Sequence, residues 1–455
     1  MTANAGNRLD DAPLSRFHKK LALYSSGGPF LDGYVLSIIG VAMVQITPQL
    51  KLSDSAQGLI GASALIGIFL GAFVGGYLTD KFGRQLLYTI DLIAIIVCSV
   101  AQFWADDPVW LFILRLLIGM AVGADYPIAT SLLAEFTPRR YRGPLLGGLV
   151  VMWFVGAAVA YIVGEILLSV GDDGWRWMLA SAALPATIIV LLRHGTPESP
   201  RWLANKGRTE EAEAVLKKVY GPDVTIADLP DEAEERENVD LKAILRSGYG
   251  GRMLYITVFW TCSIIPLFAI YAFGPKILDA LQLKGGLANI GEAMITVMFL
   301  IGCVVALLFV NRMGRRPLVI HSFVWSGLAL LLLGIFPDAP SGVIMTLFAL
   351  YAVIIGGTQI LQWVYPNELF PTEVRGSAVG LASSASRIGA AVGTYLVPMA
   401  LTGWGVGGTM LAAAAINVVG AVVSIVWAPE TRGMALHEAA ALSAKTEPAG
   451  SPAGV

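Results

Sequence analysis

The chain has 455 residues, of which 56% are hydrophobic and 14% are charged, with a mean hydropathy of +0.68 and a net charge of −2. About 25% of the residues of soluble proteins are charged, so this composition excludes an ordinary soluble enzyme or binding domain. It indicates an all-α membrane protein, and the near-neutral charge predicts no nucleic-acid partner.

Residues 1–21 are polar and contain no short apolar core before a cleavage site, so we expect a cytoplasmic tail and no cleaved signal peptide. Behind this tail lie apolar segments that are each long enough to cross a bilayer as a helix. Twelve are predicted, at 22–46, 57–79, 86–105, 108–134, 144–169, 175–193, 252–274, 289–310, 317–336, 341–363, 377–401 and 404–428.

Lys and Arg gather in alternate loops, for example at 81–84, 139–142 and 312–316. The positive-inside rule then places both termini, including the tail 429–455, in the cytoplasm. We therefore expect a multi-pass protein of the cell membrane, acting as a monomer.

A long linker, 194–251, separates two six-helix halves, 22–193 and 252–428. Its segment TEEAEAVLKKVY has the apolar spacing of a short amphipathic helix on the cytoplasmic surface. The rest reads as a solvated connector, with a regulatory docking site as the alternative.

The fourth predicted helix carries charges at membrane depth, where each costs on the order of 3 kcal/mol. Arg115 and Asp125 therefore predict a protein interior or an aqueous pathway, with a buried structural pair as the alternative for Arg115. Gly119 and Gly123, one and two turns after Arg115, predict the close approach of a second helix.

The two halves repeat each other. GYLTDKFGRQ matches LFVNRMGRRP with Asp80 opposite Asn311, an offset of 231 (311 minus 80). EFTPRRYRG matches ELFPTEVRG with Glu135 opposite Glu368, an offset of 233 (368 minus 135). Parallel repeats of this kind predict two pseudo-symmetric bundles that rock about a site near the membrane midplane.

These motifs resemble the major facilitator superfamily over nearly the whole chain. GYLTDKFGR is similar to its loop signature, and PESPRWL (197–203) and PETRG (429–433) resemble its sugar-porter and organic-ion branches. GADYP (123–127) is similar to the fourth helix of phosphate symporters, LDGYVL (31–36) to phosphate and aromatic-acid symporters, and SASRIGA (384–390) to aromatic-acid and organic-ion carriers.

The conserved loops of that superfamily imply a cytoplasmic gate. Asp80 would accept hydrogen bonds from the start of a helix in the other half, and Gly83 would permit the tight turn. Two acid–base pairs with a spacing of seven could hold the inner side shut. The predicted gate residues are Asp80, Gly83, Arg84, Glu135, Arg142, Asn311, Arg315, Glu368 and Arg375.

Asp32 and Asp125 should lie at similar depth and could bind protons, although a permanent hydrogen bond between helices is the alternative. Arg387, in the other half, presents a planar fork that matches a carboxylate, or else forms a structural pair. Side chains that could complete a substrate pocket are Tyr34, Gln359, Gln362 and Trp363.

The sequence therefore predicts a proton-coupled carrier that takes up a small organic anion, such as an aromatic carboxylate. A sugar, polyol or phosphate symporter is the alternative, although the seventh helix lacks the acid of phosphate symporters and the paired glutamines of sugar porters. A metabolite receptor without transport is the alternative of another class. We expect no enzyme activity, metal site or cofactor, and only the proton as coupling ion.

Overall fold

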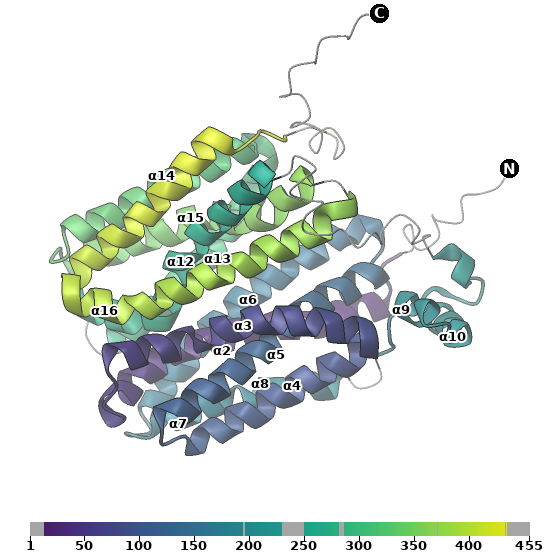
Figure 1. Ribbon diagram of the computed structural model, residues 1–455, viewed down its shortest axis with the longest axis horizontal. Helices are drawn as coiled ribbons and strands as arrows, with labels where there is room; N and C mark the ends of the chain where they lie inside the picture. The colour runs from purple at the N-terminus through teal and green to yellow at the C-terminus, as the bar shows by residue number, and fades with distance from the viewer. Residues whose placement is uncertain are drawn as a thin grey trace, which may run out of the picture. The chain divides into compact units, whose positions relative to one another are not determined.

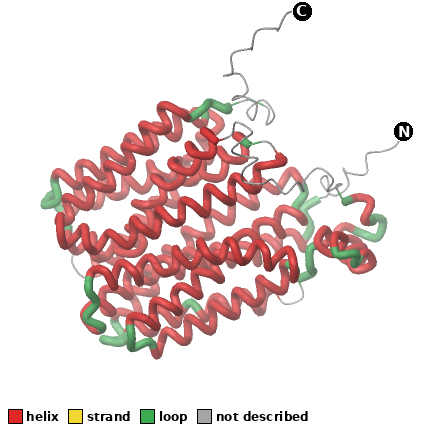
Figure 2. Tube along the Cα trace, in the orientation of Figure 1, coloured by secondary structure: helices red, strands yellow, loops and turns green. Residues whose placement is uncertain are grey.

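The computed structural model describes residues 13–193, 196–229, 250–281, 286–370, 372–432 and 434, and within them every regular element is a helix (Figures 1 and 2). Among these described residues, eleven helical segments are long and apolar enough to cross a membrane. Those of the first half and its 3-10 turn are α2 (Arg16–Gln49), α3 (Asp54–Phe82), α4 (Arg84–Ala101), η1 (Gln102–Trp104), α5 (Pro108–Phe136), α6 (Arg139–Leu168), and the consecutive α7 (Gly174–Ser181) and α8 (Ala183–Arg193), which form one span.

The second half contains five long helices, of which two are broken within their length. They are α12 (Gly250–Ala280), α13 (Gly286–Met313), α14 (Arg315–Ile335), α15 (Ser341–Leu369) and α16 (Thr372–Trp427). Gly405, with φ +68°, divides α16 into two membrane-length pieces, which gives the twelve spans predicted from the sequence. Phe273 interrupts α12 with φ −136° and ψ 16°.

The exterior of the helices is apolar, as a lipid environment requires. Ile90, Ile93 and Val97 follow one face of α4 and are about half exposed. Backbone polar groups cannot be left open to lipid, so continuous helices are the form that such apolar segments take.

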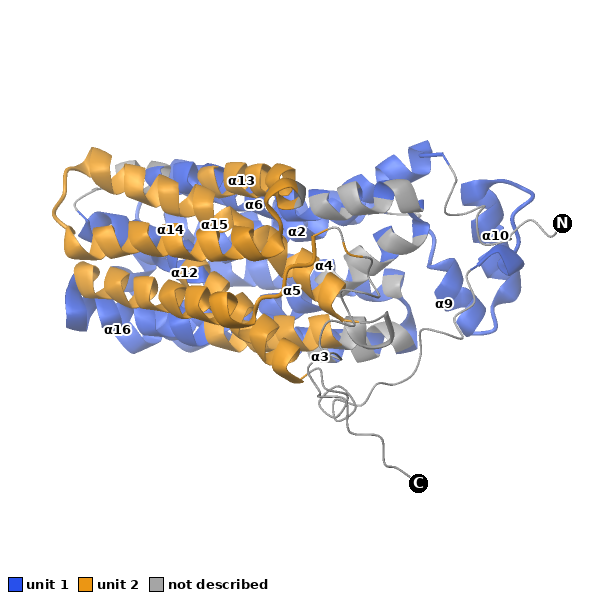
Figure 3. Cartoon of the chain, turned by 90° about the horizontal axis from the view of Figure 1, so that it is seen from above, with its two compact units in different colours: residues 1–231, 268–297, 391–405 blue, residues 232–267, 298–390, 406–455 orange. Residues whose placement is uncertain are grey.

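Two compact units can be distinguished within the described chain (Figure 3). Unit 1 comprises residues 1–231, 268–297 and 391–405, and unit 2 comprises 232–267, 298–390 and 406–455. Unit 1 thus combines the first half of the chain with the predicted outer parts of α12, α13 and α16. The division into bundles 22–193 and 252–428 stays a prediction.

Glycines on both helices let α3 pack closely against α5 in unit 1. A Cβ at Gly119 of α5 would collide with the backbone of Ala64, and one at Gly123 with the backbone of Ile68, both in α3. From the other side, Gly67 of α3 faces the backbone of α5 in the same way. The predicted approach of a second helix at Gly119 and Gly123 is therefore confirmed.

The linker contributes short helices at the predicted cytoplasmic end: α9 (Pro200–Asn205), α10 (Thr209–Tyr220) and the 3-10 turn η2 (Ile226–Asp228). The segment predicted as an amphipathic helix is α10, which buries Ala212 and Leu216. Tyr220 donates a hydrogen bond to the carbonyl oxygen of Phe136 at the end of α5, 2.7 Å away. On the exposed side, the hydrogen bond from Arg208 lowers the pKa of Glu211.

We expect Gly119→Ala to destabilise the protein by about 1–3 kcal/mol, because the new methyl group forces α3 away from α5. Gly148 of α6 is a matched control, since a Cβ there meets no atom within 4 Å. Gly148→Ala should be neutral or slightly stabilising. Thermal unfolding of the detergent-purified variants measures both, and equal stabilities for the two would contradict the role given to Gly119.

Candidate functional site

A buried charged cluster lies among four helices of unit 1, and we call its members Asp32, Tyr88, Asp91, Asp125 and Arg193 the acid cluster. Asp32 comes from α2, Tyr88 and Asp91 from α4, Asp125 from α5, and Arg193 from the end of α8. Tyr88 interacts electrostatically with the other four members. The predicted proton-coupling residues Asp32 and Asp125 therefore belong to one electrostatic network.

Asp125 is the most enclosed acid of the acid cluster, with 1% of its surface exposed. Its Oδ2 atom lies against Gly28 of α2, where any Cβ would collide with the carboxyl group and lie 3.0 Å from the hydroxyl oxygen of Tyr88. Its Oδ1 atom has no hydrogen-bond partner among the described residues. Gly28 thus makes the room that a carboxyl group needs between α2, α4 and α5.

Arg193 supplies the positive charge of the acid cluster. Its guanidinium carbon lies 3.0 Å from the ring centroid of Tyr88, and it interacts electrostatically with Asp125 and Asp91. It is 7% exposed. A cation over an aromatic face gains attraction from the ring quadrupole, and more so when desolvated.

Sequence reasoning missed three members of the acid cluster. Arg193, at the end of the sixth span, reads in the sequence as one of the loop charges that set topology. Asp91 is the eighth residue of α4 and thus an intramembrane charge, but its sequence context indicates no particular role. Nothing in the sequence pattern singled out Tyr88.

Arg115 is also buried in unit 1, but its nearest described acceptor is backbone. Its Nη2 atom donates to the carbonyl oxygen of Val35 at 3.4 Å, and the side chain is 1% exposed. Tyr34, predicted to line the substrate pocket, is 3% exposed and shares a 2.6 Å hydrogen bond with Ser181 of α7. In this structure the Tyr34 hydroxyl thus joins α2 to α7.

An amide and aromatic cluster lies in unit 2, between α12 and α15. Gln362 donates to the hydroxyl of Ser263 and to the side-chain oxygen of Gln359, and Gln359 donates to the carbonyl oxygen of Ser263 at 3.4 Å. Trp260 and Trp363 meet edge to face with centroids 5.4 Å apart. The structure thus brings together three of the predicted pocket residues, Gln359, Gln362 and Trp363, around two residues that sequence reasoning missed.

Arg387 lies near the middle of the first span of α16, in unit 2, and is half-buried. Two residues further along the same span, a Cβ at Gly389 would collide with Thr261 of α12. This contact brings the span of Arg387 against the helix that carries Trp260 and Ser263.

The predicted gate motifs begin helices with the same local geometry in both repeats. Gly83 (φ +98°) precedes α4 and Gly314 (φ +93°) precedes α14, so both occupy a backbone region that glycine alone adopts readily. A Cβ at these positions would also lie 2.7 Å from Oε2 of Glu198 and 2.6 Å from Oε2 of Glu430, respectively.

Glu198 and Glu430 cap those two helices. Glu198 accepts a hydrogen bond from the backbone N–H of Gln85 at 3.0 Å, and Glu430 accepts from those of Arg315 and Arg316 at 3.0 and 3.1 Å. Negative charge at a helix N-terminus is favoured by the helix dipole and by the exposed N–H groups. The two acids come from the motifs PES and PET, to which sequence reasoning had given no structural role.

Glu368, a predicted gate residue, pairs with Arg315 of the same repeat. Arg315 Nη2 lies 2.7 Å from Oε1 of Glu368, and the hydroxyl of Thr431 donates to Oε2 at 2.6 Å. The predicted partner Arg375 has its side chain outside the described residues, as have Asp80, Arg84, Glu135, Arg142 and Asn311. The gate therefore stays a prediction in the first repeat and in part of the second.

With the geometry in place, comparison with known proteins identifies the family. Residues 21–442 match the model of the family described as "Sugar (and other) transporter". The chain belongs to this family. It is 45% identical to the Escherichia coli protein YaaU, over 94% of this chain and 96% of that protein. It is 40% identical to the Escherichia coli inner membrane metabolite transport protein YgcS, over 94% of this chain and 95% of that protein.

Solved structures of the xylose transporter XylE from Escherichia coli share the fold. One of them, of the proton:xylose symporter of the major facilitator superfamily, has a TM-score of 0.72 and 24% identity, covering 94% of this chain and 99% of that chain. The family is one of transporters rather than enzymes, as the sequence predicted. The protein is thus a multi-pass membrane transporter of the major facilitator fold.

Removing either helix cap should destabilise the transporter. Glu198→Ala and Glu430→Ala each leave backbone N–H groups without a charged acceptor, at an expected cost of about 1–2 kcal/mol. Glu210→Ala, which removes an exposed acid from the first turn of α10, is the matched control. Thermal unfolding in detergent tests this, and full stability of both cap variants would show that water replaces the carboxylates.

Proposed function

We propose that the protein couples the entry of protons to the uptake of an organic carboxylate by alternating access across the inner membrane, with both termini in the cytoplasm. In a fold built from two repeats, alternating access proceeds as the repeats rock about a central site. The observation that carries this proposal is the enclosed carboxyl group of Asp125 within the acid cluster.

Asp125 has the surroundings that proton binding requires. A charged carboxylate is costly in a dry interior, and Arg193 offsets that cost only in part because it also interacts with Asp91 and Glu198. The cluster therefore holds more acids than bases, and adding a proton relieves the excess. Asp32, one turn from Gly28 on α2, is the second proposed proton-coupling residue.

The substrate class is proposed from unit 2. Arg387 places a guanidinium at membrane depth, where charged side chains commonly mark substrate pathways, and its planar fork binds a carboxylate with two parallel hydrogen bonds. Trp363, half-buried and packed edge to face on the fully buried Trp260, offers a flat apolar surface that suits an aromatic or other apolar body. Gln359 and Gln362 would orient the polar groups of such a substrate.

A sugar or polyol is the second candidate. The cluster of Gln359, Gln362 and Ser263 offers neutral donors and acceptors of the kind that bind hydroxyl groups. The similarity to XylE, a proton:xylose symporter, supports a sugar as substrate. The two candidates differ in whether transport depends on the charge of Arg387.

We expect Asp125→Asn to abolish substrate-driven acidification of liposomes that contain the protein, because the amide cannot exchange a proton. The assay follows internal pH after addition of benzoate-type acids, other carboxylates, phosphate or sugars. Glu210→Gln, an exposed acid of α10, is the control and should acidify like the wild type. Acidification by Asp125→Asn at the wild-type rate would remove Asp125 from proton coupling.

In the same liposomes, Arg387→Ala should lower carboxylate transport at least about tenfold, a loss expected when a charge-assisted pair of about 1.5–3 kcal/mol is removed. Arg387→Lys keeps the positive charge and loses the planar fork, so its rate of carboxylate transport should lie between those of the wild type and Arg387→Ala. If sugars alone are transported, and Arg387→Ala transports them normally, the substrate is neutral.

A further inference from the structure

The break in α12 exposes a backbone carbonyl that unit 1 satisfies from another helix. Pro275 has no N–H, so the carbonyl of Tyr271, four residues earlier, lacks its helical donor. Tyr161 of α6 donates its hydroxyl hydrogen to that oxygen at 3.0 Å. The same oxygen lies against Gly40 of α2, where a Cβ would approach it to 2.6 Å.

A buried acid lies beside this break. Glu292, seven residues into α13, is 1% exposed, and its carboxyl group lies against Gly274, where any Cβ would collide with it. Its Oε2 atom has no hydrogen-bond partner among the described residues. Because Gly274 directly follows the non-helical Phe273, the carboxyl group occupies space that the broken turn provides.

The described group that interacts with Glu292 is aromatic. Tyr161 of α6 interacts electrostatically with Glu292 and with Tyr271 of α12, and Gly40 of α2 lies against the carbonyl oxygen of Tyr271. No charged side chain of the described residues interacts with Glu292. A carboxylate without a counter-charge is costly in such a site, so the site suits the neutral acid.

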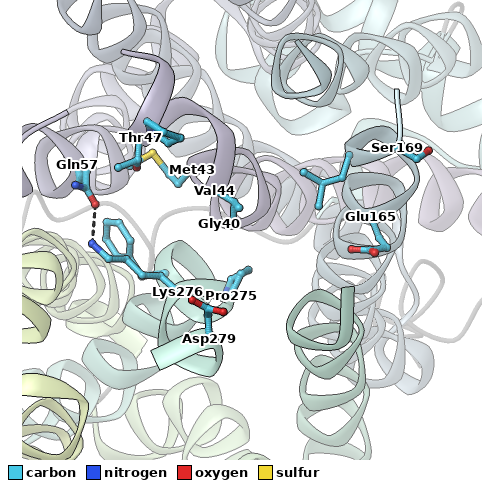
Figure 4. Close-up of a pocket in the computed structure, with 13 residues that line it drawn as sticks. Gly40, Met43, Val44, Thr47, Gln57, Glu165, Ser169, Pro275, Lys276 and Asp279 are labelled. Carbon is cyan, nitrogen blue, oxygen red and sulfur yellow. Dashed lines mark hydrogen bonds between the residues drawn. The ribbon is translucent and has the colours of Figure 1, made fainter. Parts of the chain in front are cut away.

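The break and Glu292 adjoin a pocket at the predicted outer ends of α2, α3, α6 and α12. The pocket has a volume of about 580 Å³ and is lined by Met43, Gln57, Glu165, Phe273, Pro275, Lys276 and Asp279, among others (Figure 4). Lys276 donates to the side-chain oxygen of Gln57 at 2.8 Å, which joins α12 to α3. The charged side chains of Glu165, Lys276 and Asp279 line the pocket, whereas Glu292 is not among the lining residues.

The outer parts of α12, α13 and α16 belong to the same compact unit as α2, α3 and α6. Contacts such as Tyr161 with Tyr271, and Ser55 with Tyr395 at 3.1 Å, join them. Since α12, α13 and α16 come from the second repeat, separation of the repeats at this end would break these contacts and admit water to Glu292. The environment of Glu292 therefore depends on whether the outer side is closed.

We propose that Glu292 is a second protonation site, which takes up a proton from the outside when the outer side closes and returns it when that side opens. It rests on the proposed alternating access. The proton at Glu292 controls closure without being carried across, in contrast to the proton proposed for Asp125. Low external pH should therefore favour the closed outer side.

The test follows access to the pocket rather than transport. Met43 lines the pocket and is 4% exposed, so Met43→Cys should react with a membrane-impermeant maleimide only when the outer side opens. In right-side-out membrane vesicles we expect the labelling rate to rise with external pH, by at most about tenfold per unit for one linked proton. Vesicles without Met43→Cys control for the buried Cys98, Cys262 and Cys303.

Glu292→Gln on this background should label slowly at every pH, because the amide cannot lose a proton. Glu165→Gln, on α6 and at the pocket wall, is the matched control and should keep the wild-type pH dependence. A wild-type pH dependence in Glu292→Gln would overturn the proposal. If the pH dependence is kept in Glu292→Gln but lost in Asp125→Asn, the linked proton belongs to Asp125 instead.

Two further variants keep the test decisive if Glu292→Gln does not fold. Gly274→Ala displaces the carboxyl group, and Tyr161→Phe removes the donor to the carbonyl of Tyr271, so both should raise labelling about tenfold at low pH. Gly251→Ala, in the same helix with no atom within 4 Å of its new methyl group, should label like the wild type. Unchanged labelling in both test variants would show that the break does not hold the outer side closed.

Discussion

The cost of leaving a charge or a backbone polar group unsatisfied in a membrane interior governs this protein. This cost explains why the apolar segments are helices. It also explains why polar groups at the irregular features have partners on other helices. Pro275 leaves one carbonyl without its helical donor, and a tyrosine of α6 satisfies it. Asp91 and Asp125 lie buried in the first half, and Arg193 interacts with both from the end of α8. Polar groups at membrane depth are therefore the positions at which a change of state can be favoured or opposed.

The two repeats begin their third helices with the same capped geometry at the predicted cytoplasmic ends, and they differ in their interiors. In both, a glycine with positive φ starts a helix and an acid from a later motif caps it, Glu198 in one and Glu430 in the other. At membrane depth, unit 1 contains the acid cluster, whereas unit 2 has an amide and aromatic cluster. The two repeats thus keep the same capped helix starts at their predicted cytoplasmic ends. Their interiors differ, with the proposed proton chemistry in one and the proposed substrate recognition in the other.

Much of the fold could be predicted, because the signals that determine it are local. Twenty apolar residues specify a span, and Gly119 and Gly123 specify close packing, so both predictions are confirmed. The single α16 that contains two spans was also predicted as two segments, 377–401 and 404–428, and the observed break at Gly405 lies at the start of the second. The amphipathic pattern of α10 identified a helix even in the polar linker.

The candidate site could be predicted only in part, because its members come from distant parts of the chain. Asp125 and Asp32 were identified since an acid inside an apolar segment stands out on its own. Arg193 did not stand out, because a residue at the end of a span reads as a loop charge until its side chain is seen to reach Tyr88. Nothing in the sequence around Ser263 and Trp260 marks them as site residues. They are recognised only through their contacts with Gln359, Gln362 and Trp363 of α15. Likewise, the ion pair of Glu368 with Arg315 joins two positions 53 residues apart, which no fixed spacing indicates.

The late position of the two capping acids has a consequence for biosynthesis. Glu198 caps a helix whose hydrogen-bonded residue, Gln85, precedes it by 113 positions, and Glu430 follows Arg315 by 115. Each acid comes directly after the last span of its own repeat. The backbone N–H groups at the start of the third helix of a repeat therefore have no carboxylate acceptor until the ribosome has made all six spans of that repeat. Each half of the transporter is completed by the last residues of that half to be synthesised, which makes the repeat a unit of assembly as well as a unit of symmetry.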